Sequence, residues 1–222
     1  MLFRSDLRGP ALRLCVARVH RQVQEHELHV GRVTPDRGAA CDGDRVETGA
    51  LTSLVDRALA RAWRRDSTIH GDDHWRCVAA TGLALAAGAT QIDRTLVFCF
   101  GLLHDTRRLT DGLDVEHGSR AASYARELRD ESLLPLDEMR FALLAEALEH
   151  HSNGLVSADA TTGTCWDADR LHLPRVSIRP RPDLFSTRAA HGEEPLAAAA
   201  RLRAGGPPAW DALVSAVAAP AH

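Results

Sequence analysis

Apolar positions recur with a helical period along the chain from Leu51 onward. In the stretch "LTSLVDRALARAW" the apolar stripe comprises Leu51, Leu54, Val55, Ala58, Leu59 and Ala62. The same period predicts helices over residues 72–88, 90–105, 114–130 and 135–151, with punctuation at Gly88 and at Asn153-Gly154. A short helix over 164–173 ends at Pro174, residues 175–187 form a proline-broken loop, and two weaker helices cover 195–204 and 209–219. These patterns predict an all-α protein.

The periodicity also divides the chain. Residues 1–50 are rich in Gly, Asp, Arg and Thr and show no helical period, so we expect an irregular N-terminal extension there. We expect a helical domain over residues 51–190. Residues 191–222 should form a C-terminal helical tail packed on or near that domain.

Composition narrows the classes of function. Hydrophobic residues make up 45% of the chain and aromatic residues 5%, and the abundant alanine and leucine favour helices. The formal net charge is −3, and all 27 basic residues are arginine, so we expect neither a nucleic-acid polymer nor a membrane as partner. Five dispersed cysteines without a CxxC pair, and no signal-peptide core, favour a reducing, cytoplasmic location. A homo-oligomer stays open.

Imidazoles and carboxylates interrupt the apolar pattern at the helix ends. They are His74, His104, Asp105, His117, His150, His151, Asp167 and Asp169. Burying an unpaired polar group costs roughly 2–7 kcal/mol, and burying a charge costs more. A divalent cation removes that penalty by using the nitrogen and oxygen lone pairs as ligands. The pattern therefore predicts a metal site in the core of a helical bundle.

The order of these residues resembles a known family. His74, then His104-Asp105, then the distant Asp169 is similar to the HD superfamily of metal-dependent phosphohydrolases, over about residues 66–185. The surrounding stretches "HWRCVAATGLALA", "LLHD" and "DADRL" are similar to its motifs too.

The resemblance implies a helical bundle with a divalent metal ion at its centre. His74, His104, Asp105 and Asp169 would be the metal ligands, with His104 and Asp105 as the catalytic dyad. Nitrogen and oxygen ligands without thiolate suit Mn, Mg, Fe, Co or Ni. Asp167 is expected to cap its helix or to orient a ligand, and His70 is expected to lie in a loop.

Three further histidines lie between the dyad and Asp169. The order of His117, His150 and His151 resembles the binuclear branch of the superfamily, so they are candidates for a second metal or for substrate binding. The stretch "HHSNGLVSADATTG" lacks that branch's GYP segment, which disfavours cyclic di-GMP as substrate. Only one of the adjacent His150 and His151 should face inward, and the sequence does not decide which.

Two arginines follow the dyad directly. Arg107 and Arg108 each carry a planar fork of donors that suits phosphate, and pairing with Asp111 is the alternative. The expected function is a metal-dependent phosphohydrolase acting on a small phosphorylated molecule, a nucleotide or another phosphoester. Two alternatives stay open, namely a di-iron oxygenase of HD type and a non-catalytic HD-fold sensing module.

Overall fold

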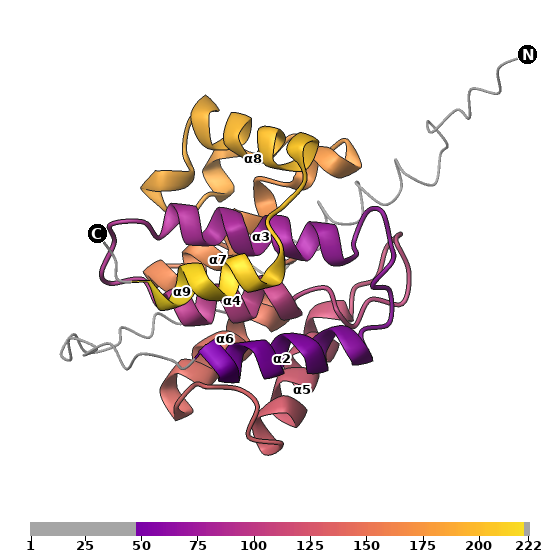
Figure 1. Cartoon of the computed structure of the whole chain (residues 1–222). Coiled ribbons are helices and arrows are strands. Elements are labelled where there is room, and N and C mark those ends of the chain that lie inside the picture. The colour runs from indigo at the N-terminus through magenta and orange to yellow at the C-terminus, as the bar shows by residue number, and fades with distance from the viewer. Residues whose placement is uncertain (1–47, 220–222) are drawn as a thin grey trace, which may run out of the picture. The chain divides into compact units, whose positions relative to one another are not determined.

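The structure is a computed structural model that describes residues 48–219, in which helices joined by loops form all the regular secondary structure, with no strand among these residues (Figure 1). The predicted all-α bundle is confirmed. Residues 1–47, which make up most of the expected irregular extension, lie outside the described residues. Residues 220–222 of the expected tail also lie outside them.

Eight α-helices and three short 3-10 helices follow one another within residues 48–219. They are α2 (Thr48–Arg61), α3 (Asp72–Leu85), α4 (Arg94–Leu103), α5 (His117–Asp130), α6 (Glu138–His150), α7 (Ala160–Arg170), η1 (Leu173–Val176), η2 (Pro182–Leu184), η3 (Arg188–Ala190), α8 (Glu193–Gly205) and α9 (Trp210–Ala218).

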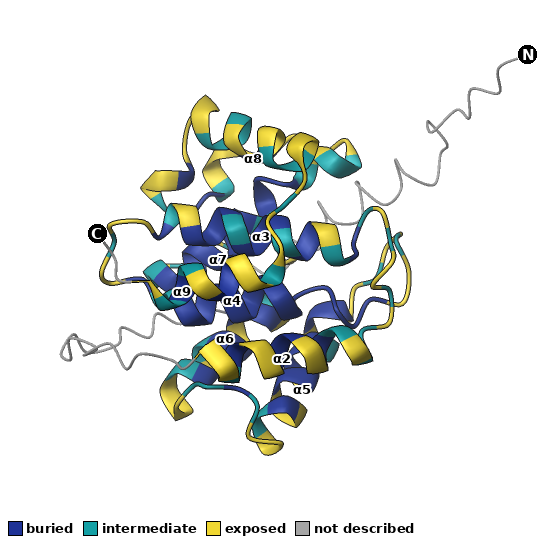
Figure 2. Ribbon diagram, viewed as in Figure 1, coloured by how far each residue is buried: buried dark blue, intermediate teal, exposed yellow. Residues whose placement is uncertain are grey.

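Helix α4 lies at the centre of the bundle. Its residues Thr95 to Leu103 are all buried, which explains why the stretch "TLVFCFGLL" has no polar face (Figure 2). Helices α3, α6 and α7 pack around it. The residues that follow the C-terminal end of α4, His104 and Asp105, therefore lie in the interior of the domain.

Two close approaches between helices depend on glycine. A Cβ on Gly101 of α4 would lie 2.6 Å from the Cα of Ala79 in α3, so the two backbones touch here. A Cβ on Gly118 of α5 would lie 2.7 Å from the carbonyl oxygens of Leu148 and Glu149. The start of α5 thus lies against the end of α6, as expected for an antiparallel pair.

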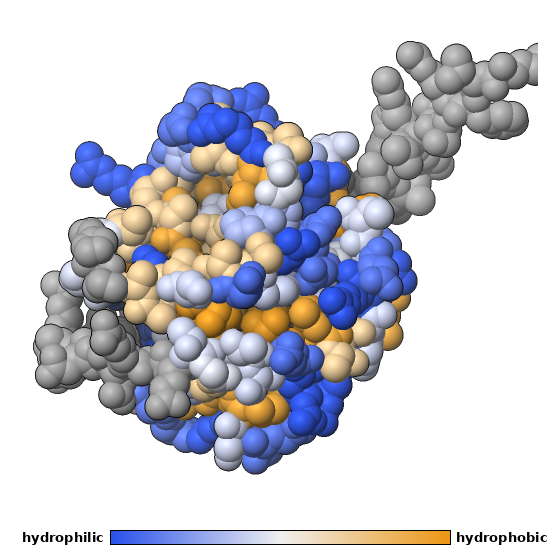
Figure 3. All heavy atoms as spheres, in the orientation of Figure 1, coloured by the Kyte–Doolittle hydropathy of each residue, from blue (hydrophilic) through white to orange (hydrophobic). Residues whose placement is uncertain are grey.

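The remaining helices cover this centre. Helix α2 buries Leu51, Leu54, Val55 and Ala58, which are four members of the predicted stripe. Helix α9 packs against α2, α3 and α4, and apolar atoms gather along it and beside α2 in the space-filling view (Figure 3). Helix α8 contacts α3 and is mostly exposed (Figure 2). Both weak C-terminal helices predicted from the sequence do form.

Several helix boundaries differ from the prediction because capping residues fix them. Helix α4 begins at Arg94 rather than near residue 90, since the Asp93 carboxylate accepts the Leu96 N–H at 2.9 Å. Asp137 likewise starts α6 three residues after Pro135. Asp159 starts α7 at Ala160, four residues before the predicted start. Helix α3 ends at Leu85, before Gly88.

None of the helices that the structure describes has both the length and the apolar character needed to cross a membrane.

The close approach at Gly101 gives a test of the packing. Gly101→Ala should lower the free energy of unfolding by roughly 1–3 kcal/mol, because the new methyl group meets the backbone of α3. Gly49→Ala is the matched control, since a Cβ at that helical position meets nothing within 4 Å. Urea unfolding measures both variants. Equal stability of G101A and the wild type would contradict this packing.

Candidate metal centre

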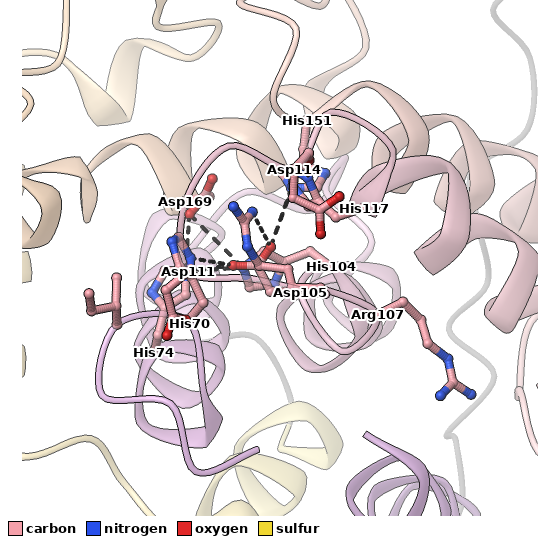
Figure 4. A network of polar contacts seen from close by, with 12 residues as sticks. His70, His74, His104, Asp105, Arg107, Asp111, Asp114, His117, His151 and Asp169 are labelled. Carbon is pink, nitrogen blue, oxygen red and sulfur yellow. Dashed lines mark hydrogen bonds and ion pairs between the residues drawn. The ribbon is translucent and has the colours of Figure 1, made fainter. Parts of the chain in front are cut away.

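The end of α4 places the dyad. His104 caps the helix, with its N–H bonded to the Phe100 carbonyl at 3.0 Å, and Asp105 continues the turn. The side chain of His104 is fully buried and that of Asp105 is 2% exposed. Both side chains enter a cluster of imidazoles and carboxylates that come from α3, α5, α6 and α7 (Figure 4).

One group of ligand atoms joins α3, α4 and α7. The Nε2 atoms of His74 and His104 are 3.1 Å apart. Asp169 Oδ1 lies 3.2 Å from His74 Nε2 and 4.0 Å from His104 Nε2. These three atoms lie within 4.8 Å of one another, which is close enough for one metal ion.

A second group lies on the far side of Asp105. The Nε2 atoms of His117 and His151 are 2.8 Å apart, and Asp105 Oδ1 lies 3.5 Å and 3.9 Å from them respectively. His117 begins α5 and His151 caps α6, so the contact at Gly118 brings these two histidines together.

The carboxylate of Asp105 connects the two groups. Its Oδ2 atom lies 3.7 Å from His104 Nε2 and 3.8 Å from His74 Nε2, while Oδ1 faces the second group. A third set of three ligand atoms comprises His70, His74 and Asp105, and His70 Nδ1 lies 2.9 Å from Asp105 Oδ2.

The hydrogen bonds of three rings fix their tautomers. His104, His117 and His151 each place Nδ1 against the carbonyl oxygen three residues earlier, which can only accept. Each Nδ1 therefore donates, and in the neutral ring Nε2 carries a bare lone pair. The Nε2 atoms of His117 and His151 then bring two lone pairs together at 2.8 Å. A metal ion bound between the two nitrogens would make that contact favourable.

Electrostatics sets the charge of these groups. Burial lowers the pKa of His151 to about 3, and it lowers the pKa of His117 and of His74 as well. Burial alone would raise the pKa of Asp105, but nearby imidazoles, His104 first, hold it well below its ordinary value. The pKa of Asp169 is also held low against the effect of burial, mainly by the adjacent His74 ring. Neutral imidazoles and ionised carboxylates are the forms that ligate metals.

Unsatisfied atoms support the same interpretation. Asp169 Oδ1 and His74 Nδ1 are buried without a hydrogen-bond partner. An ionised buried oxygen without a donor is costly, and a cation at that oxygen removes the cost. The nitrogen and oxygen donor set therefore fits a divalent metal ion, and the buried His/Asp cluster can hold one.

The structure brings most, but not all, of the predicted residues together. His74, His104, Asp105, His117, His151 and Asp169 meet in the cluster. His150 does not join them, because its ring turns outward to Asn153. Arg107 points away from the cluster (Figure 4), its guanidinium stacking 3.5 Å from the Tyr124 ring centroid. Asp167 accepts the N–H groups of Ser186 and Thr187 and so anchors the loop after η2.

Sequence reasoning missed three residues beside the cluster. His70 bonds Asp105, although it was expected to be an ordinary loop residue. Arg175 lies 3.6 Å from Asp169 Oδ1 through Nη1. His172 is fully buried between Thr81, at 2.8 Å, and Arg203, at 3.1 Å. The four-residue spacing between His70 and His74 could have indicated His70. Nothing in the sequence singled out Arg175 or His172.

Comparison with models of known protein families, with curated proteins and with solved structures finds no match for this chain.

The low pKa of His151 predicts acid sensitivity of the metal-free protein. Its pKa is about 3 in the folded state against 6.5 ordinarily, so the unfolded state binds more protons as the pH falls below 6.5. Stability therefore falls with pH, and His151 contributes about 2 kcal/mol of loss between about pH 7 and about pH 5.

His151→Asn removes the titrating ring and keeps a donor toward the Leu148 carbonyl. Urea unfolding of both proteins in the presence of a chelator should show a shallower pH dependence for the variant. An unchanged pH dependence would mean that His151 is not held neutral.

Proposed function

We propose that the protein is a metal-dependent phosphohydrolase of HD type, acting on a small phosphorylated molecule such as a nucleotide or another phosphoester. The observation that carries the proposal is that His74, the adjacent His104 and Asp105, and Asp169 come from separate helices and meet at atoms close enough to share one ion. These are the four residues on which the resemblance to the HD superfamily rests.

Each part of the cluster has a task in this proposal. His74, His104 and Asp169, with Oδ2 of Asp105, would hold one ion. His117 and His151, with Oδ1 of Asp105, would hold a second. When bound, such ions supply an acidified water and polarise a phosphoryl oxygen.

Other residues of the chain orient these ligands and set the local charge. The backbone carbonyls that accept from the three Nδ1 atoms fix each ring with Nε2 inward. His70 donates to Asp105 and so fixes the plane of the carboxylate. Arg108 lies 3.2 Å from Asp105 Oδ1 and adds positive charge beside the cluster. In this proposal Arg108 contributes positive charge near the ions, and Arg107 takes no part in binding phosphate.

One observation favours a second candidate, a di-iron oxygenase of HD type. The two ligand groups share one carboxylate and together contain four histidines, a donor set that also suits iron. Iron with uptake of dioxygen would favour this reading. Ions without redox activity, together with phosphate release, favour the hydrolase.

The hydrolase is tested by metal content and phosphate release together. Protein supplied with Mn, Mg, Co or Ni is assayed against a panel of nucleotides and other phosphoesters. Asp105→Asn keeps the size of the side chain but removes the charge shared by both groups, so it should cut phosphate release roughly a hundredfold or more and lower the bound metal. His117→Ala should lower the metal content while leaving the group at His74 intact.

His150→Ala is the matched control, because His150 adjoins His151 in sequence but lies outside the cluster. It should keep both the bound metal and the activity. A wild-type protein that binds none of these metals and releases no phosphate would contradict the proposal. Metal binding without any turnover would favour the sensing module.

A further inference from the structure

Arg175 occupies a fixed position beside the candidate metal centre. It belongs to η1, directly after Pro174, and its side chain is only 12% exposed. Its Nε atom donates to the Ile69 carbonyl at 3.0 Å, which ties the guanidinium to the loop that carries His70. The terminal nitrogens therefore point toward the cluster without freedom to turn away.

Neither terminal nitrogen of Arg175 has a satisfactory acceptor. Nη1 is buried without a hydrogen-bond partner, because Asp169 Oδ1 is 3.6 Å away. Nη2 lies 3.2 Å from His70 Nδ1, but that nitrogen already faces Asp105 Oδ2 at 2.9 Å. A ring nitrogen that donates to a carboxylate cannot also accept from arginine. The fork of Arg175 is thus left with open donors.

The charges of the metal-loaded site favour an anionic ligand. Asp105 and Asp169 carry two negative charges, and Arg108 and Arg175 carry two positive charges, so the four balance. A divalent cation on Asp169 would share that oxygen with Arg175 and leave a surplus of two positive charges, and a second ion between His117 and His151 would add two more. Repulsion between such groups in a buried site is strong unless an anion lies against both.

Asp169 and Arg175 keep the largest exposed fractions among the side chains of the cluster, ahead of His70 and Arg108 at 9% each. The side chain of Asp169 is 13% exposed and that of Arg175 is 12%, whereas His104 is fully buried and both Asp105 and His151 are 2% exposed. A molecule that approaches from solvent therefore meets Arg175 and Asp169 before the inner ligands.

We propose that Arg175 is the residue that grips the substrate phosphate, and that the substrate presents a terminal, dianionic phosphate, as in a phosphomonoester. The inference rests on the proposed function and narrows its substrate class. A guanidinium fork pairs with two oxygens of one phosphate, and a dianion offsets more of the surplus positive charge than a monoanion does. Phosphodiesters, with a single charge, match the site less well.

The other arginines are placed differently. Arg107 donates to the Arg61 carbonyl at 2.6 Å and stacks on Tyr124, away from the cluster. Arg108 uses all three nitrogens within its own loop and on Asp105, so it adds charge but has a less open fork. Among these three arginines, Arg175 alone combines proximity to the cluster with unpaired donors.

Calorimetric titration of the metal-loaded protein tests the proposal without an activity assay. Inorganic phosphate and methyl phosphate should bind at least about tenfold tighter than dimethyl phosphate. Arg175→Lys, which keeps the charge but loses the fork, should weaken phosphate binding about tenfold or more while the metal content stays unchanged. Arg107→Lys is the matched control and should bind phosphate like the wild type.

Three results would overturn the inference: phosphate binding by R175K equal to that of the wild type, equal binding of methyl and dimethyl phosphate by the wild type, or no binding of either. The comparison of esters uses the wild type and so decides the matter even if R175K does not fold. Phosphate binding that depends on Arg175 without hydrolysis of any phosphoester would sink the proposed function and leave this anion site. Hydrolysis that does not depend on Arg175 would support the proposed function but contradict the role of Arg175. A protein that binds no metal would contradict both.

Discussion

The buried carboxylate of Asp105 is the interaction around which this interior is arranged. One of its oxygens faces His74 and His104, and the other faces His117 and His151. Ring nitrogens meet at 3.1 Å in the first group and at 2.8 Å in the second, where both lone pairs point inward. A protein interior tolerates such an arrangement only when positive charge sits among the lone pairs. The imidazoles, the carboxylates and the proposed ions therefore form one interdependent unit.

The helical packing serves this unit, and much of that packing was predictable. The apolar run before His104 required a buried helix, and the structure has α4 at its centre. The apolar period did not define the exact helix boundaries. Capping residues define them, since Asp93 and Asp159 set the starts of α4 and α7. The contact at Gly118 that joins α5 to α6 depends on tertiary structure, and no local pattern indicated it.

The candidate site was predictable to the extent that its residues interrupt apolar patterns. His104 and Asp105 stood out for that reason. The choice between His150 and His151 could not be made, because it depends on how the last turn of α6 faces α5. Arg175 lies in a segment with no period, and only the fold brings it beside Asp169. The sequence therefore indicated the clustered histidines and carboxylates but not the groups around them.

Everything proposed for this interior requires one cation to be shared by side chains from separate helices. Anomalous diffraction from crystals of protein purified without added metal, recorded across the absorption edges of the first-row metals, tests it most directly. The account predicts an anomalous peak in contact with Nε2 of His74, Nε2 of His104 and Oδ1 of Asp169. Clear density for these side chains with no peak among them, in metal-supplemented crystals as well, would contradict it.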